Sequence, residues 1–205
     1  MDGAVGARVP RRGNAFTRGL GRLTMRLMGW RLVGQVPDIP KFVAIAAPHS
    51  SNWDFVVAMA VAFAIGVRVT VLGKHTLFKG PLAPLMRFLD VMPVNRAAPQ
   101  GVVGDCVAAF DAADQLVIGV APDGTRGGKT GAGGDAGRWK SGFYRIARAA
   151  RVPVLPVALD YGRREARFGP VLIPTGDEAA DLAQLSLFYA GTRGKRRSIG
   201  AAVSF

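Results

Sequence analysis

Residues 46–55 of this chain read AAPHSSNWDF. An apolar segment typical of a short buried strand precedes them, and an apolar segment typical of a helix follows them. Pro48 fixes its own φ and biases the preceding residue to extended geometry, so we expect the strand to stop at Ala47. His49 and Asp54 therefore lie where a strand gives way to a helix, a common place for reactive side chains in α/β proteins.

The pair supports one kind of chemistry, the deprotonation of an alcohol. Neutral His49 can take a hydroxyl proton near working pH, while Asp54 holds the ring tautomer and stabilises the imidazolium that forms. The alternative interpretation is structural, because Asn52 and Asp54 can each cap the following helix and His49 can be a turn residue. Both interpretations stay open on this stretch alone.

Composition and charge limit the partners of the chain. At 205 residues it is long enough for one sizeable core, and its mean hydropathy of +0.21 is high for a freely soluble protein. The net charge of +13 indicates an anionic partner or substrate: nucleic acid, acidic lipid headgroups or a phosphorylated compound. Because no zinc, RRM or KH signature is readable, we expect no nucleic-acid partner.

Two features bear on location. Cys106 is the only cysteine, so no intrachain disulfide forms and a reducing cytoplasm is the natural compartment; its apolar neighbours predict a buried residue rather than a nucleophile. The longest uncharged apolar run, residues 55–67, falls well short of the ~20 residues of a bilayer span. We therefore expect a cytoplasmic protein that is peripheral on the inner face of the membrane.

The N-terminal region predicts a surface helix. Residues 1–13 are expected to form a flexible arm, and residues 14–36 a basic amphipathic helix. Its apolar residues recur on one face and its arginines on another: Phe16, Leu20, Leu23, Leu27 and Trp30, against Arg18, Arg22 and Arg26. Such a helix either lies in an anionic interface or packs on the core with a solvated basic face. Residues 193–205 are expected to be a loose basic tail.

Residues 37–192 are expected to form one α/β domain. Apolar strands alternate with helical segments, which favours a central mixed, largely parallel β-sheet flanked by helices, plus the N-terminal amphipathic helix. The strand predicted over residues 152–161 contains Pro153 and Pro156, which argues for an edge strand or a bulge.

Cations gather at several predicted strand ends. The strand at residues 116–120 leads to Asp123-Gly124-Thr125-Arg126, a glycine-bearing turn that could hold a phosphate or a developing oxyanion. Lys74 and Arg96 bracket a hydrophobic segment, an arrangement that suits a substrate with an anionic head and an apolar tail.

Four blocks together resemble the glycerol-3-phosphate and 1-acylglycerol-3-phosphate acyltransferase family. His49 to Asp54 resembles its His-four-residues-Asp block, and residues 78–96, ending Val94-Asn95-Arg96, resemble the second. Residues 123–126 and 152–157 resemble the third and fourth blocks, in the right order. One departure is that Asp123 stands where the family carries Glu.

The resemblance implies transfer of a fatty acyl group from acyl-CoA or acyl carrier protein to a hydroxyl of a lysophospholipid or glycerol-phosphate acceptor. His49 and Asp54 would be catalytic, and no metal or further cofactor would be required. The substrate-binding residues would be Lys74, Asn95, Arg96, Asp123, Gly124, Thr125 and Arg126, with the two arginines on the acceptor phosphate. The alternative is a non-catalytic basic protein that binds lipid or membrane surfaces on the same fold.

Overall fold

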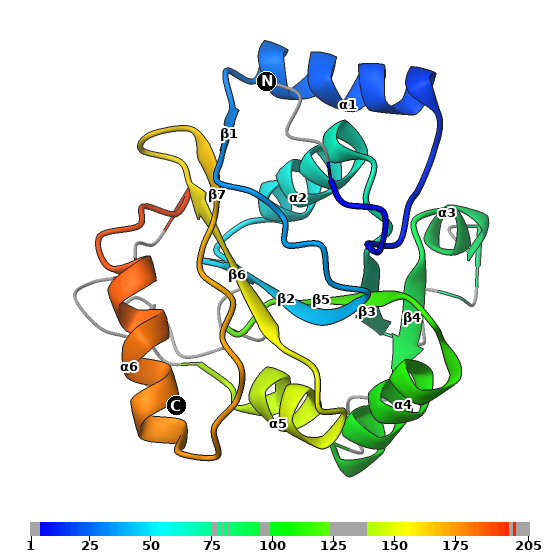
Figure 1. Cartoon of the computed structure of the whole chain (residues 1–205). Coiled ribbons are helices and arrows are strands. Elements are labelled where there is room, and N and C mark those ends of the chain that lie inside the picture. The colour runs from blue at the N-terminus through cyan, green and yellow to red at the C-terminus, as the bar shows by residue number, and fades with distance from the viewer. Residues whose placement is uncertain are drawn as a thin grey trace.

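The computed structural model describes residues 5–74, 78, 80–81, 83–94, 99–123, 139–196 and 199. Its strands are β1 (Arg31–Val33), β2 (Lys41–Ala47), β3 (Thr70–Lys74), β4 (Val91–Val94), β5 (Leu116–Val120), β6 (Val154–Asp160) and β7 (Glu165–Phe168). Its helices are α1 (Ala15–Leu27), α2 (Asn52–Ile65), α3 (Ala83–Phe88), α4 (Pro99–Ala112), α5 (Gly142–Ala149) and α6 (Glu178–Tyr189). Figure 1 shows one sheet with helices on both faces.

The described strands form one seven-stranded sheet in the order β1-β7-β6-β2-β5-β3-β4. The five strands from β6 to β4 are parallel, whereas β7 is antiparallel to β6 and β1 is parallel to β7. The sheet is therefore mixed and largely parallel, which confirms the predicted fold class. The carboxyl ends of β2 and β5 meet at one edge, and the turns that follow them are neighbours.

The central strands bury side chains on both faces of the sheet. In β2, Val43 and Ile45 pack in the layer that contains α4, α5 and α6, while Phe42 and the alanines at 44 and 46 face α1 and α2. This alternation follows from the two-residue period of a strand. Figure 1 shows α1 and α2 above the sheet, and α4 and α5 below it.

The N-terminal helix is shorter than the range 14–36. It ends at Leu27 because Gly29 adopts a φ of 70°, and the chain then extends into β1. Residues 5–13, for which the sequence predicted a flexible arm, pack against the domain in the structure. Val9 has no exposed surface, and the Pro10 carbonyl accepts a 2.8 Å hydrogen bond from the Arg68 N–H.

Of the two alternatives predicted for residues 152–161, an edge strand or a bulge, the edge position is wrong. β6 lies between β2 and β7. Pro156 is tolerated there because a strand residue's N and O atoms point to the same side, and the Pro156 carbonyl accepts from the Gly169 N–H on the β7 side. The position without an N–H in Pro156 therefore also faces β7, so no ladder bond to β2 is lost. Pairing with β7 begins only at Val157, so the proline interrupts none of those pairs either.

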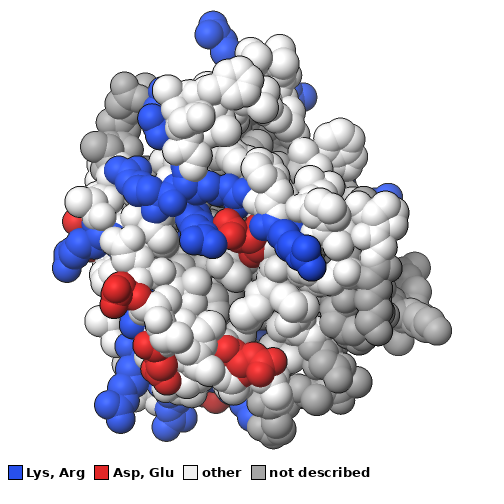
Figure 2. All heavy atoms as spheres, turned by 90° about the vertical axis from the view of Figure 1, so that its right-hand side faces the viewer, with Lys and Arg blue, Asp and Glu red and all other residues white. Residues whose placement is uncertain are grey.

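Part of the positive charge is neutralised within the fold. Asp90, which directly precedes β4, forms ion pairs with Arg12 and with Arg68, each with an N–O distance of 2.8 Å. Figure 2 shows Lys and Arg side chains in a band across this side of the molecule, with acidic side chains among and below them. None of the helices in the described part of the chain has the length and apolar character needed to cross a bilayer.

Candidate active site

The turn between β2 and α2 is built by a helix cap. Ser51 is the N-cap of α2, and its Oγ accepts a 3.2 Å hydrogen bond from the Trp53 N–H. Asp54 completes the capping box as the third residue of the helix, so it does cap α2, whereas Asn52 is the first helical residue and not the cap. The cap fixes the direction in which the Asp54 carboxylate points.

That carboxylate is buried and lies next to the His49 ring. Asp54 Oδ2 accepts hydrogen bonds from the N–H groups of Ser50 at 2.6 Å and Ser51 at 2.5 Å. His49 Nδ1 lies 3.6 Å from the same oxygen, and the exposed fraction of the Asp54 side chain is 0%. A separation of 3.6 Å is longer than a hydrogen bond, as is often found in active sites without a substrate. The arrangement turns Nδ1 toward the carboxylate and Nε2 away from it.

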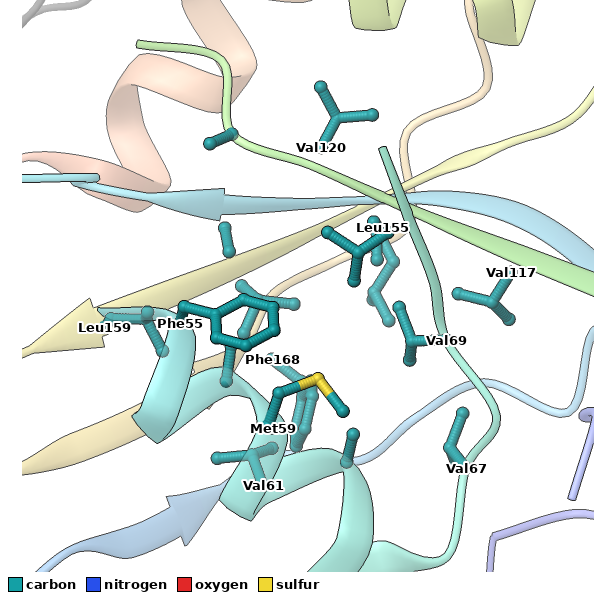
Figure 3. A pocket seen from close by; sticks show the side chains of 18 of the residues that line it. Phe55, Met59, Val61, Val67, Val69, Val117, Val120, Leu155, Leu159 and Phe168 are labelled. Atoms are coloured by element: carbon teal, nitrogen blue, oxygen red, sulfur yellow. The ribbon is translucent and has the colours of Figure 1, made fainter. Parts of the chain in front are cut away.

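His49 and Asp54 also line an apolar cavity of about 140 Å³ between α2 and the sheet. Figure 3 shows its wall, with Phe55 and Met59 from α2 facing Leu155 of β6 and Val117 of β5. Small residues open the space: Ala44, Ala46, Ala58, Ala62 and Gly119 also line it. The volume is of the same order as an engineered apolar cavity of about 150 Å³ that stays dry and takes up benzene. The site therefore places an imidazole–carboxylate pair beside a space suited to hydrocarbon.

Asp123 contacts the backbone of the candidate base. It follows β5, and its Oδ2 accepts a hydrogen bond from the His49 N–H. The sequence placed Asp123 among substrate-binding residues, but in the structure this oxygen holds the turn that carries His49. The two strand-end turns singled out in the sequence are thus joined directly.

The other predicted site residues can be placed only in part. Lys74 ends β3, on the same edge of the sheet as His49, but its side chain is not described. The remaining predicted residues, Asn95, Arg96, Gly124, Thr125 and Arg126, lie outside the described residues. The structure therefore brings together His49, Asp54 and Asp123.

Sequence reasoning missed Tyr161, which directly follows β6. Its hydroxyl is buried and interacts with the Asp54 carboxylate, although neither the hydroxyl nor Asp54 Oδ1 makes a hydrogen bond of good geometry with a described residue. Burial and then the neighbouring Asp54 carboxylate raise the pKa of Tyr161 well above its ordinary value. Trp30 packs edge-on against the tyrosine ring with centroids 4.9 Å apart. A polar residue at the end of the strand beside β2 was the sequence signal that could have identified it.

The described residues offer neither a reactive cysteine nor a metal centre. Cys106 is fully buried, and burial, followed by the charge of Asp105, raises the pKa of its thiol to about 11, which confirms a buried residue unsuited to nucleophilic attack. Among the described residues, no group of three or more His, Cys, Asp or Glu side chains could hold a metal ion.

Comparisons with known proteins point the same way as the site. The model of the family described as Acyltransferase matches residues 31–160, more than half of the chain. The fold is similar to the crystal structure of the 1-acyl-sn-glycerophosphate (LPA) acyltransferase PlsC from Thermotoga maritima. That match has a TM-score of 0.52 and 18% sequence identity, and it covers 80% of this chain and 70% of that one. No curated protein matches. This chain belongs to the acyltransferase family.

Proposed function

We propose that this protein transfers a fatty acyl group from an acyl thioester to the hydroxyl of a lysophospholipid or glycerol-phosphate acceptor. The observation that carries the proposal is the position of His49 and Asp54 together in the wall of an apolar cavity. A base beside a space for hydrocarbon is what the reaction requires, because the thioester carbon lies at the end of an acyl chain.

In the proposed mechanism His49 Nε2 takes the proton of the acceptor hydroxyl. The resulting alkoxide attacks the thioester carbonyl, the C–S bond breaks, and the thiol leaves with the proton that the imidazolium returns. Asp54 keeps the Nδ1 proton facing its carboxylate and stabilises the imidazolium. No acyl-enzyme forms, and the only co-substrate is acyl-CoA or acyl carrier protein, without a metal or other cofactor.

Two further observations support a lipid-phosphate acceptor. The Thermotoga protein of similar fold is named as an acyltransferase that acts on 1-acyl-sn-glycerophosphate. The net charge of +13 favours anionic substrates. By their resemblance to the family blocks, Arg96 and Arg126 would hold the acceptor phosphate.

The test is an acyl-transfer assay with labelled acyl-CoA or acyl carrier protein and lysophosphatidate, with the product identified by mass. The variant His49→Ala should lose transfer by at least roughly 10³-fold, because the general base and the nucleophile it activates act together. His75→Ala, which removes the only other histidine, is the matched control and should keep wild-type turnover.

The outcome also decides against the non-catalytic alternative. A lipid-binding protein without catalysis would show no turnover in the wild type, and equal lipid affinity in both variants. Turnover that survives in His49→Ala would reject the mechanism, because Asp54 alone cannot relay the proton.

We further propose that α1 docks the enzyme on an anionic membrane surface. The face of α1 that carries Gly21 packs closely on α2: a Cβ at Gly21 would lie only 2.5 Å from the Ala64 backbone N. Four large apolar residues of the helix point away from the domain: Phe16 is 77% exposed, Leu20 55%, Leu23 51% and Leu27 78%, whereas Met25 is buried. Of the two interpretations left open by the sequence, this exposure supports an interfacial helix, with Arg26 among its cations.

Vesicle binding tests the docking. The double variant Leu20→Ser/Leu23→Ser should bind vesicles of phosphatidylcholine and phosphatidylglycerol roughly tenfold more weakly, since each leucine loses part of its apolar transfer energy. Leu187→Ser is the matched control, because Leu187 is 82% exposed on α6 in the opposite layer. An equal loss of vesicle binding in the double variant and in Leu187→Ser would contradict docking by α1.

A further inference from the structure

Residues 193–196, which follow α6 and are called the C-terminal segment below, lie against the candidate active site between Thr192 and Ile199. The residues that flank it are buried: Thr192 has no exposed surface and Ile199 is 1% exposed. The Ile199 N–H donates a 2.9 Å hydrogen bond to the Thr192 carbonyl. The sequence had predicted a loose tail from residue 193 onward. Ile199 instead belongs to the core between the sheet and α5 and α6, and it ties the segment to the domain.

Between these ends the segment touches the catalytic turn directly. The Arg196 N–H donates a 3.2 Å hydrogen bond to Ser50 Oγ, on the residue that follows His49. The Lys195 ammonium lies 4.5 Å from the centre of the Trp53 ring, next to Asp54 in sequence. On the other side, the Tyr161 N–H donates to the Arg193 carbonyl at 2.7 Å. The backbone of residues 193–196 is therefore fixed beside the site.

This placement concentrates positive charge at the catalytic turn. The side chains of Arg193, Lys195 and Arg196 are exposed, and within the described part of the chain none of the three forms an ion pair. Arg193 and Arg163 also line a hollow of about 260 Å³, together with the buried Asp160. Exposed cations on a fixed backbone, in no ion pair with a described residue, form a surface suited to a phosphate group.

We propose that residues 193–196 form a phosphate-binding rim of the active site, with Lys195 and Arg196 as its principal cations. The ligand is a phosphate group of a substrate, carried either by the acyl donor or by the acceptor. The proposal rests on the proposed function for the identity of the substrates, but the binding it predicts does not require turnover. It adds cations from a C-terminal segment to the arginines of the second and third blocks.

Titration calorimetry tests the rim with three probes: CoA, pantetheine, which carries no phosphate, and glycerol 3-phosphate. The variant Lys195→Gln/Arg196→Gln removes both charges, leaves polar side chains in their place and keeps the backbone bond to Ser50. It should weaken binding of CoA or of glycerol 3-phosphate roughly fivefold, from two exposed charge interactions, and leave pantetheine unchanged. If the double variant binds CoA more weakly, the acyl donor carries the phosphate that the rim binds. If it binds glycerol 3-phosphate more weakly, the acceptor carries that phosphate.

Arg87→Gln is the control for net charge. Arg87 is exposed on α3, which precedes β4 and so lies at the opposite end of the parallel strands, and its loss should change none of the three affinities. Unchanged binding of both phosphate probes in the double variant would overturn the proposal. So would a double variant that loses only its affinity for phosphatidylglycerol vesicles, because the segment would then contact the membrane. A wild type that binds the probes without turnover would reject the proposed function and leave the rim standing.

Discussion

Asp54 and Asp181 are both buried aspartates beside a tyrosine, yet their surroundings differ. Asp181, on α6, is fully buried and receives donors on both oxygens, from the Tyr144 hydroxyl at 2.6 Å and from Thr175 N–H and Oγ1 at 2.8 and 3.0 Å. Asp54 is 1% exposed, but only its Oδ2 accepts hydrogen bonds from described residues.

Under the proposed mechanism, the difference separates a carboxylate that stabilises the fold from one that takes part in the reaction. A buried acceptor without a well-aligned donor costs up to about 1–3 kcal/mol, so the arrangement at Asp54 is less stabilising than that at Asp181. Asp181 shows that this fold can satisfy a buried carboxylate completely when no reaction depends on it. Three substitutions break or sharpen the comparison.

Asp54→Asn should have the largest effect. The amide oxygen can still accept from Ser50 and Ser51, so the helix cap survives, but the neutral amide no longer stabilises the imidazolium that forms on His49. We expect acyl transfer to fall by roughly 10³–10⁴-fold, about 4–5 kcal/mol of transition-state stabilisation. Steady-state kinetics measures it, and thermal unfolding checks the fold. Activity within tenfold of wild type would remove Asp54 from the mechanism.

Asp181→Asn should act on stability instead. Replacing a charged acceptor that holds α5, α6 and the Thr175 turn together should lower the free energy of unfolding by about 2–3 kcal/mol. Urea unfolding measures the loss. Turnover at low temperature should stay close to wild type, and a large fall in kcat of the folded variant would contradict the division between the two aspartates.

The pH dependence of that loss follows from the pKa of Asp181. Burial alone would raise it, but hydrogen bonds from Tyr144 and Thr175 outweigh burial and lower the pKa below its ordinary value. The stabilisation is therefore complete above the unfolded pKa of about 4 and is lost as pH falls through the folded value. The stability difference between wild type and Asp181→Asn should shrink as the pH is lowered below about 4.

The sequence predicted most of this fold from local signals. The β2–α2 junction was readable because an apolar run, a proline and a capping residue lie within a few positions of each other. The place of β6 inside the sheet was not, because it depends on β7 returning antiparallel. The end of α1 was misplaced because hydrophobic spacing continued to Trp30 after Gly29 had already broken the helix.

In the candidate site, too, residues close together in sequence were predicted and residues that arrive from distant positions were not. His49 and Asp54 were predicted because they are five residues apart in one turn. Tyr161 and Arg196 were not, because they approach that turn from positions more than 100 residues later, through β6 and through the burial of Ile199. Asp123 was predicted to bind substrate, and its hydrogen bond to the His49 N–H was not foreseen, because that bond depends on how closely the ends of β2 and β5 approach.

Tyr161→Phe should have the smallest effect and sharpens the comparison most. It removes only the hydroxyl beside Asp54 and keeps the ring against Trp30, so kcat should fall roughly fivefold, about 1 kcal/mol, with KM and the melting temperature unchanged. Tyr144→Phe is the matched control, because it removes the hydroxyl that donates to Asp181 and should lower the melting temperature without changing kcat. If both variants lost stability and neither lost kcat, Tyr161 would be structural and the carboxylate at Asp54 would be oriented by its own turn alone.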